Sequence, residues 1–367
     1  MTRWSIALGL LLIAACARSS SDEFAVDVLA DFDQPWAMAF LPDGRLLVSE
    51  KRGSLKLYGG RGDIIEIPGL PPVAYGGQGG LGDIALHPEF PENRMLYFSY
   101  AEEDDRVQGA VVARGRLVER DRGLGLENVE VIWRQVPKVS GRGHYGHRIV
   151  FGPAGHLWVS SGDRQKFSPA QDMRGNLGKI VRLDDAGGSP GDNPFADRGG
   201  VAAQIWSLGH RNPLGLAFDP EGRLWCVEMG PAGGDELNLI ERGANYGYPE
   251  VSEGSHYSGA GIPDHASRPE FAPPVIAWTP VISPSSLMFY DGAEFPEWQG
   301  SAFIGGLSSK GLVRLVFQDE QAREAQRLPL EARIRDVVQG PDGALWVLED
   351  ERRSSRGRLL RLSRPAS

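Results

Sequence analysis

One pattern of hydrophobic and polar positions recurs along this chain: a short apolar segment, a turn containing proline and glycine, and a second segment of alternating apolar residues. The clear copies are AFLPDGRLLVSE (39–50), VFGPAGHLWVSSGD (150–163), AFDPEGRLWCVEMG (217–230) and VQGPDGALWVLED (338–350), and a looser copy spans 85–100. Alternation with a period of two around a Pro-x-Gly turn is typical of a β-hairpin. We therefore expect each copy to form two antiparallel strands.

The spacing of the copies indicates how many sheets the chain forms. The interval between the turn residues Pro220 and Pro341 is about twice the two intervals before it, so a degenerate copy is expected between them, at 286–307. Six similar units of roughly 45–65 residues predict an all-β, six-bladed β-propeller of four-stranded antiparallel sheets. A large β-sandwich is the alternative, but that fold does not explain why one sequence motif recurs six times. In a propeller, loops from distant repeats converge on one end of the channel.

The composition fits this architecture. The chain has 367 residues, with 48 glycines and 26 prolines and no collagen-like period, as expected for many tight turns. Its net charge of −9 argues against nucleic acid as a partner. Arginines placed at particular points of an acidic chain raise the question of which anion they bind.

The N-terminus has the pattern of an export signal. Its apolar run, 6–15, is too short to anchor in a bilayer, and its LIAAC ending resembles a bacterial lipobox. We expect a lipoprotein-type signal peptide at 1–15, lipidated Cys16, a tether at 16–23 and the propeller domain at 24–367. The protein would then be exported to the periplasm and held at the membrane only by its lipid anchor. A plain signal peptide cleaved near Ala15 is the alternative.

The first candidate chemistry lies in GHYGHRIVFGPAGHLWVSSGD, residues 143–163. His144 precedes one hairpin copy and Asp163 follows its second strand, so pairing of the strands would bring both to the same edge. A carboxylate beside an imidazole fixes its tautomer and raises its basicity, as a general base requires. The alternative is a surface histidine beside an aspartate that closes a turn.

Basic and amide side chains stand next to the other copies. Arg211 and Asn212 precede the copy at 217–230, and such an arginine is costly to bury unless it meets an anion. Arg333 and Arg335 stand two apart, so in a strand they share one face and can clamp an anion. Further candidates are Gln78 in a glycine-rich loop, Lys310 in the preceding unit and, for a hard cation such as Ca²⁺, the carbonyls of the GPAGGDEL segment.

Several enzyme classes lack their signatures in this chain. There is no G-x-S-x-G before a helix and no Walker or Rossmann glycine pattern in a βαβ setting. A cationic channel with a base and a hard cation would suit a ligand that carries several carboxylates.

Several segments of the sequence resemble those of a known family, the soluble aldose sugar and glucose/sorbosone dehydrogenases that use pyrroloquinoline quinone (PQQ). The phrases that carry the resemblance are, in order, GQGGLGDIALHPEF, GHYGHRIVFGP, LGHRNPLGLAFDP, GPAGGDELNLIERGANYGYP, SPSSLMFYDG and RIRDVVQGPDGALWVL. It covers nearly all of the chain from about Phe24. It implies a Ca²⁺- and PQQ-dependent oxidation of an aldose at C1 to the lactone. The electrons would pass to an unidentified acceptor, a respiratory quinone or a cytochrome.

The same resemblance implies roles for the candidate residues. His144 would be the general base, Asp163 would orient it, and Arg211 would stabilise negative charge on the reduced cofactor. The implied cofactor-binding residues are Gln78, Arg211, Asn212, Arg333 and Arg335. The implied Ca²⁺ ligands are the backbone carbonyls of Gly230 and Pro231.

The chain also departs from the family pattern. Ser308 stands where a lysine is usual, and Lys310, two residues on and hence expected on the same strand face, is predicted to bind the cofactor in its place. Met229, Val281 and His147 also replace residues more usual in the family. Two other functions therefore stay open: a propeller that has lost PQQ and binds carbohydrate or protein, and a Ca²⁺-dependent propeller lactonase.

Overall fold

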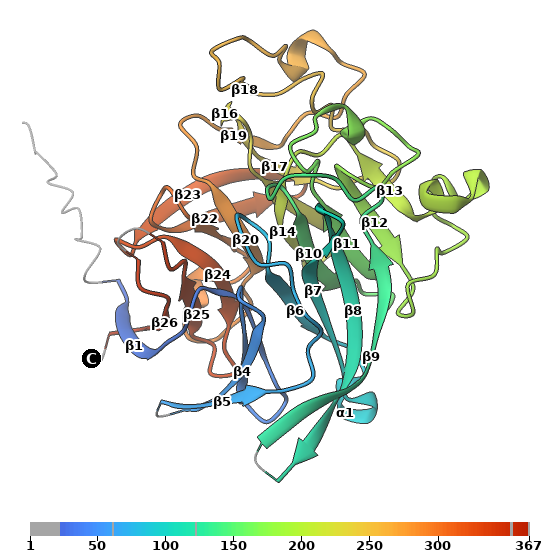
Figure 1. Cartoon of the computed structure of the whole chain (residues 1–367). Coiled ribbons are helices and arrows are strands. Elements are labelled where there is room, and N and C mark those ends of the chain that lie inside the picture. Colours follow the sequence, from blue (N-terminus) through green and yellow to red (C-terminus); the bar gives the residue numbers. More distant parts are fainter. Residues whose placement is uncertain (1–22, 61, 122, 353–354, 366–367) are drawn as a thin grey trace, which may run out of the picture.

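The chain folds into a closed ring of six four-stranded antiparallel sheets, the predicted six-bladed β-propeller (Figure 1). The computed structural model describes residues 23–365 except 61, 122, 353 and 354. The predicted signal peptide and Cys16 lie outside these residues. No helix among the described residues is long and apolar enough to cross a membrane.

Each blade is built from strands that follow one another in the chain, except where the ring closes. From the channel outward, the first blade contains β2 (Pro35–Phe40), β3 (Leu46–Glu50), β4 (Ser54–Gly60) and β5 (Asp63–Ile67), and the second contains β6 (Leu81–Leu86), β7 (Met95–Asp104), β8 (Val107–Arg120) and β9 (Gly123–Arg134). The third blade contains β10 (Gly146–Phe151), β11 (Leu157–Ser161), β12 (Lys179–Leu183) and β13 (Ile205–Leu208), and the fourth contains β14 (Pro213–Phe218), β15 (Leu224–Glu228), β17 (Asp235–Leu239) and β19 (Ile276–Trp278). The fifth blade contains β20 (Pro284–Phe289), β21 (Ala302–Gly306), β22 (Gly311–Gln318) and β23 (Gln321–Pro329), and the sixth contains β24 (Ile334–Gln339), β25 (Leu345–Glu349), β26 (Arg358–Ser363) and β1 (Ala25–Asp31).

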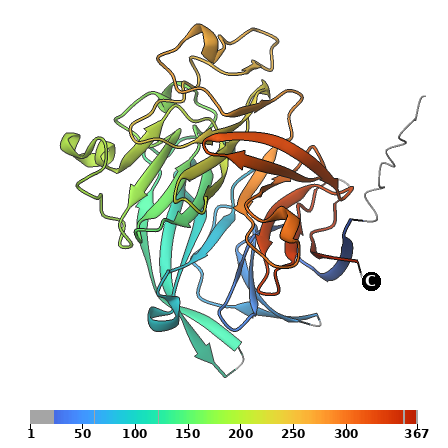
Figure 2. The same cartoon turned by 180° about the vertical axis from the view of Figure 1, so that it is seen from behind.

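The remaining elements lie in the connections. The pair β16 (Ala232–Gly233) and β18 (Gly254–Ser255) forms a small separate sheet, and the loop after β18 projects at the top of Figure 1. At the opposite end, the β8–β9 ribbon extends beyond the blades (Figure 2). The helices are short: α1 (Phe90–Asn93), η2 (Ser168–Ala170), η3 (Ala196–Arg198), η4 (Gly200–Gln204), η5 (His265–Ser267) and η6 (Pro296–Trp298).

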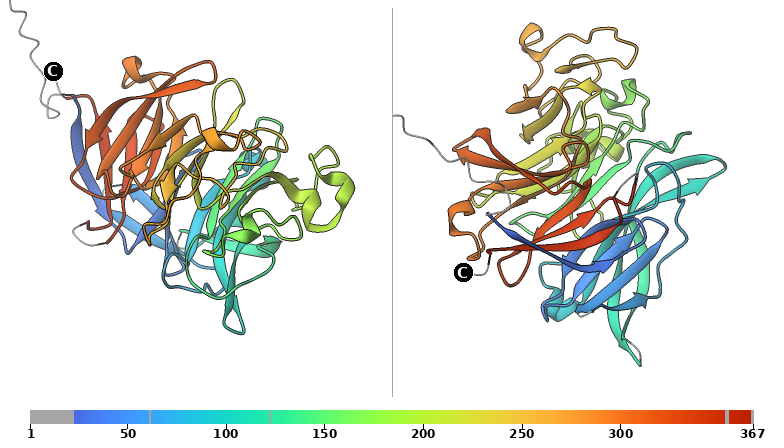
Figure 3. Two further views of the ribbon diagram at one scale, coloured as in Figure 1. Left: turned by 90° about the horizontal axis from the view of Figure 1, so that it is seen from above. Right: turned by 90° about the vertical axis from the view of Figure 1, so that its left-hand side faces the viewer.

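The recurring hairpin motif forms the two innermost strands of each blade. The degenerate copy at 286–307 also does so, as β20 and β21, but η6 lies in its longer connection. The ring is closed by the N-terminal strand β1, which pairs with β26 from Ala25↔Ser363 to Asp31↔Arg358. Figure 3 shows this blue strand beside the red C-terminal strands.

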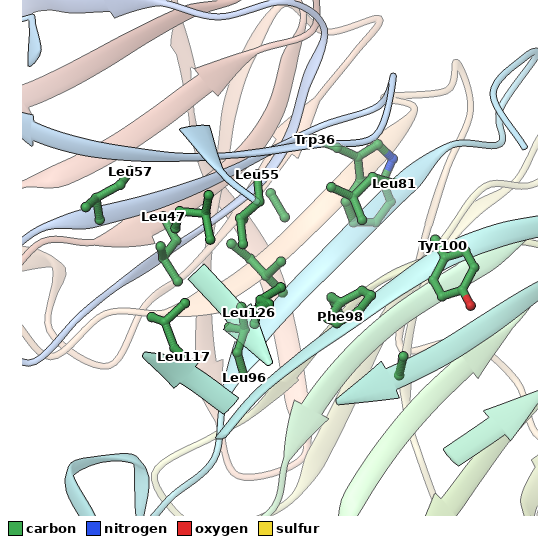
Figure 4. Close-up of a cluster of buried hydrophobic side chains, with 14 of the residues drawn as sticks. Trp36, Leu47, Leu55, Leu57, Leu81, Leu96, Phe98, Tyr100, Leu117 and Leu126 are labelled. Atoms are coloured by element: carbon green, nitrogen blue, oxygen red, sulfur yellow. The ribbon is translucent and has the colours of Figure 1, made fainter. Parts of the chain in front are cut away.

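The hydrophobic core lies between neighbouring blades. In Figure 4, Leu47, Leu55 and Leu57 of the first blade face Leu96 and Phe98 of the second, and all five are buried. Burying such side chains stabilises the fold by about 1.5–3 kcal/mol each. Equivalent clusters hold the other blades together.

Every innermost strand carries a register shift close to its first residue, at the end that faces the candidate site. In β10 the shift falls between Gly146 and Ile149, which takes His147 and Arg148 out of the regular ladder. A bulge redirects side chains in this way. It turns the side chain of Arg148 toward the centre of the ring.

Arg148 joins all six innermost strands at the floor of the site. Its contacts outside β10 are Trp36 in β2 (guanidinium 4.2 Å from the ring centroid), Asp83 in β6 (3.1 Å), the Leu214 carbonyl in β14 (2.7 Å), the Ser285 carbonyl in β20 (2.6 Å) and Asp336 in β24 (3.2 Å). Asp83 and Asp336 are both buried. It also lies 3.4 Å from the Arg335 carbonyl in β24. One guanidinium therefore links two carboxylates and three carbonyls across the channel.

Candidate active site

A cavity of about 890 Å³ occupies the channel end where the innermost strands begin. Its wall includes three residues bonded to or packed on Arg148: Trp36, Leu214 and Arg335. A second cavity, of about 250 Å³, is lined by Arg148, Asp83 and Asp336. Arg148, Asp83 and Asp336, which we call the Arg148 cluster, therefore line the second cavity and not the candidate site.

His144 and Asp163 meet as the hairpin predicts. The Nδ1 of His144 lies 2.7 Å from Oδ1 of Asp163, and both side chains are buried. Because a carboxylate is an acceptor, the imidazole donates from Nδ1 and its Nε2 carries the lone pair. Burial lowers the pKa of His144, and nearby Arg211 lowers it further, while Asp163 opposes the shift. The ring is therefore neutral at pH 7, with Nε2 able to accept a proton.

The backbone around His144 is held by specific contacts. Its N–H donates to Oε1 of Gln78 at 2.7 Å, and its carbonyl accepts from the N–H of Arg164 at 3.1 Å. His144 adopts a φ of 48°, a conformation uncommon for residues other than glycine. A Cβ at position 162 would overlap the His144 carbonyl, so Gly162 allows this close approach. Gly143, Tyr145 and Gly146, on either side of His144, line the cavity.

Arg211 and Asn212 bring unpaired donors to the same region. Nη1 of Arg211 donates to the carbonyl of Met229 at 2.9 Å, and Nη2 lies 3.4 Å from the hydroxyl of Tyr257. Among the described residues, Nε of Arg211 and Nδ2 of Asn212 are buried without a hydrogen-bond partner. A buried donor without a partner costs about 1–3 kcal/mol, so a ligand with acceptor oxygens would satisfy both.

Arg333 and Arg335 share one carboxylate at the cavity wall. Nε of Arg333 lies 2.9 Å from one oxygen of Asp350, and Nη2 of Arg335 lies 2.6 Å from the other. Burial alone would raise the pKa of Asp350, but the two arginines lower it to about 2. All three residues line the cavity. The predicted clamp is therefore present, with one of its two charges balanced by Asp350.

The predicted Ca²⁺ loop is adjacent to Met229, which lines the cavity. The N–H of Gly230 donates to Oδ1 of Asp235 at 2.9 Å, and the other oxygen of Asp235 accepts from the N–H of Ser283 at 2.6 Å. Asp235 thus fixes the backbone that carries the carbonyls of Gly230 and Pro231. The described residues contain no cluster of three or more His, Cys, Asp or Glu side chains suited to a metal, so a cation here would depend on carbonyls and ligand atoms.

Lys310 and Ser308 do not share a strand face, so that prediction is wrong. β21 ends at Gly306 and β22 begins at Gly311, so both residues lie in the turn between them. In a turn, residues two apart do not share a face. Ser308 and Lys310 are exposed, and neither is among the residues that line the cavity.

The structure adds cavity residues that the motifs did not single out, chiefly Lys51, Tyr75 and Arg142. Lys51 follows β3 directly, just as Met229, Leu307 and Asp350 follow the second strands of their blades, and all four line the cavity. The residue after the second strand of a repeat was therefore the signal that could have identified Lys51.

The chain is similar to known proteins over most of its length. Residues 32–361 match the family model described as Glucose / Sorbosone dehydrogenase. The chain is 40% identical over 349 residues to the aldose sugar dehydrogenase YliI of Escherichia coli K12, covering 92% of each.

Two solved structures share the fold and much of the length. The apo-form of the soluble aldose sugar dehydrogenase from Escherichia coli superposes with a TM-score of 0.86 at 40% identity, covering 93% of this chain and 100% of that one. The PQQ-bound aldose sugar dehydrogenase from Streptomyces coelicolor gives a TM-score of 0.76 at 29% identity, covering 93% and 98%.

Proposed function

The chain belongs to the glucose/sorbosone dehydrogenase family, and from this premise we propose that it oxidises the C1 hydroxyl of aldose sugars to the lactone with PQQ as the cofactor. The observation that carries the proposal is the buried His144–Asp163 pair beside a cation-rich cavity. The Streptomyces relative of known structure binds PQQ.

Residues in the cavity wall and beside it fit such a cofactor. PQQ carries three carboxylates and two quinone carbonyls, all of them acceptors, and the site offers the unpaired donors Arg211 Nε and Asn212 Nδ2. Arg333 and Arg335 supply positive charge, and Gln78 lines the same cavity. The carbonyls of Gly230 and Pro231 would contribute to a Ca²⁺ site. When bound, PQQ would supply the oxidant, a quinone that accepts hydride.

The protein groups perform the acid–base part of the reaction. Nε2 of His144 takes the proton of the sugar C1 hydroxyl, and Asp163 holds the ring in the required tautomer and stabilises the imidazolium. The guanidinium of Arg211, fixed by Met229 and Tyr257, favours negative charge that develops beside it. Arg148, Asp83 and Asp336 line the separate second cavity and so lie outside the cavity that would hold the cofactor.

The test is a titration of PQQ into Ca²⁺-loaded apoprotein, followed by a dye-linked assay with a panel of aldoses. We expect tight binding and sugar-dependent dye reduction that requires PQQ, and we expect His144→Ala to abolish the reduction while still binding PQQ. Failure of the wild type to bind PQQ would contradict the proposal. Lactone hydrolysis without PQQ would instead identify a lactonase.

A further inference from the structure

Lys51 is fixed at the cavity wall directly after β3 of the first blade. Its N–H donates to the carbonyl of Gln34 and its own carbonyl accepts from the N–H of Leu81, both at 3.0 Å. These bonds set the backbone, and the side chain lines the cavity. Lys51 is therefore part of the site through its position in the fold.

The ammonium of Lys51 has more hydrogen-bond donors than it has described partners. An ammonium has three N–H donors, and within the described residues Nζ makes one hydrogen bond, to the carbonyl of Gly77 at 3.0 Å. It forms no salt bridge with a described carboxylate. Two donors are thus left for a ligand.

The charges around Lys51 are unbalanced. The cavity is lined by five cationic side chains, Lys51, Arg142, Arg333, Arg335 and Arg352, and by the two carboxylates Asp350 and Glu351. Asp350 already pairs with Arg333 and Arg335. Burial, and next to it the charge of Arg335, lower the pKa of Lys51 to about 8. An anion bound beside Lys51 would favour the charged ammonium and so oppose this shift.

We infer that Lys51 and Arg335 form a carboxylate-binding subsite on the side of the cavity between the first and sixth blades, and that Lys51, rather than Lys310, supplies the ammonium of the site. The identity of the carboxylate rests on the proposed function. It is either a carboxylate of PQQ or that of an acidic sugar such as a uronic acid.

The first measurement is the calorimetric Kd of PQQ for the Ca²⁺-loaded protein. We expect Lys51→Met to weaken binding about tenfold, as for loss of one partly buried charge contact, and Lys51→Arg to retain it within about threefold. Lys51→Gln removes the charge but keeps a donor for Gly77, so it should behave like Lys51→Met. Lys310→Met removes the same charge outside the cavity and should leave the Kd unchanged. Thermal melts establish that each variant is folded.

The second measurement separates the two sources of the carboxylate. With PQQ saturating, KM is compared for glucose and glucuronate. A weaker PQQ Kd with an unchanged ratio of the two KM values assigns the subsite to the cofactor. An unchanged Kd with KM raised about tenfold for glucuronate alone assigns it to the substrate. If Lys51→Met alters neither quantity, the inference is wrong.

A citrate-binding measurement distinguishes failure of the Lys51 subsite from failure of the proposed function. If the wild type does not bind PQQ, the proposed function fails, and citrate then serves as a carboxylate probe. Weaker citrate binding in Lys51→Met than in Lys310→Met would still support the subsite, whereas equal binding would overturn it.

Discussion

At the scale of single residues, Asp163 organises the candidate base. One oxygen accepts from Nδ1 of His144 and the N–H of Gln165, and the other accepts from the N–H of Phe167. Its own N–H donates to the carbonyl of Arg211 at 2.8 Å. The same residue therefore holds the imidazole, the turn that follows β11 and the backbone of Arg211.

Substitution of Asp163 tests this organisation. In Asp163→Asn, the amide can present its N–H₂ group to Nδ1 and favour the wrong tautomer, so we expect kcat to fall about 10²–10⁴-fold with little change in PQQ binding. Steady-state kinetics combined with calorimetric titration of PQQ make the measurement. A fall in PQQ affinity that accounts for the whole loss of activity would show that Asp163 acts on the cofactor site instead.

The pH profile tests the protonation state of His144. The protonated imidazole is the inactive form, so activity should be lost as pH falls through the His144 pKa and retained above it. Because burial and Arg211 lower this pKa, the acidic midpoint of kcat/KM should lie below the ordinary imidazole value of about 6.5. A midpoint above pH 7 would show that another group controls the acidic limb.

At the scale of secondary-structure elements, the repeat determines where site residues occur. The innermost hairpin of each blade brings the start of its first strand beside the end of its second, and the residues there line one cavity. Arg333 with Asp350 is such a pair in the sixth blade. His144 with Asp163 is the equivalent pair in the third blade, where the neighbouring Gly143, Tyr145 and Gly146 line the cavity. The propeller places these equivalent edges around one channel.

The sequence identified the hairpins but not where each strand stops. Six copies of one hairpin motif were enough to predict the ring, because the alternation of apolar and polar residues with a period of two is a local property of the sequence. The position of Lys310 depended on whether β21 continues past Gly306, and Gly-rich sequence there does not decide between strand and turn. Lys51 was missed because its neighbours in the cavity, Gly77 and Arg335, come from distant segments.

Closure of the ring by β1 is tested at Phe24. Phe24 is buried with Leu360 and Leu362 of β26, whereas Val28 in β1 is 54% exposed. We expect Phe24→Ala to lower the free energy of unfolding by about 3 kcal/mol and Val28→Ala by under about 0.5 kcal/mol. Denaturant unfolding measures both, and hydrogen exchange should show faster exchange in β26 for Phe24→Ala. Equal stabilities would show that β1 closes the ring through backbone pairing alone.

At the scale of the whole molecule, one charged cluster connects the blades on which the site depends. Arg148 pairs with Asp83 and Asp336, so the buried cluster has one positive group against two carboxylates. Burial raises the pKa of both aspartates, that of Asp336 to about 6, while Arg148 opposes the shift. The cluster lies directly beneath the cavity, so its loss should affect both the ring and the site.

Arg148→Met removes the cation and leaves two carboxylates buried without it. Breaking a buried pair from one side costs about 3–5 kcal/mol, and we expect that loss in the free energy of unfolding near pH 7. The control is Arg45→Met, which breaks an exposed pair with Asp43 and should cost about 1 kcal/mol or less.

The pH dependence of this variant distinguishes the cluster from a simple packing defect. A carboxyl group whose pKa is raised on folding contributes stability below its unfolded pKa, near 3.9, and loses it as pH rises through its folded value. Without Arg148, the folded pKa values of Asp83 and Asp336 rise further, so the deficit of Arg148→Met should shrink as pH falls from above 7 toward the wild-type folded values, about 6 for Asp336. Adding Asp336→Asn should recover part of the stability at pH 7, because one uncompensated charge is gone. A deficit that stays constant with pH would mean that Arg148 stabilises the ring through its packing on Trp36 and its bonds to carbonyls, with little contribution from the two aspartates.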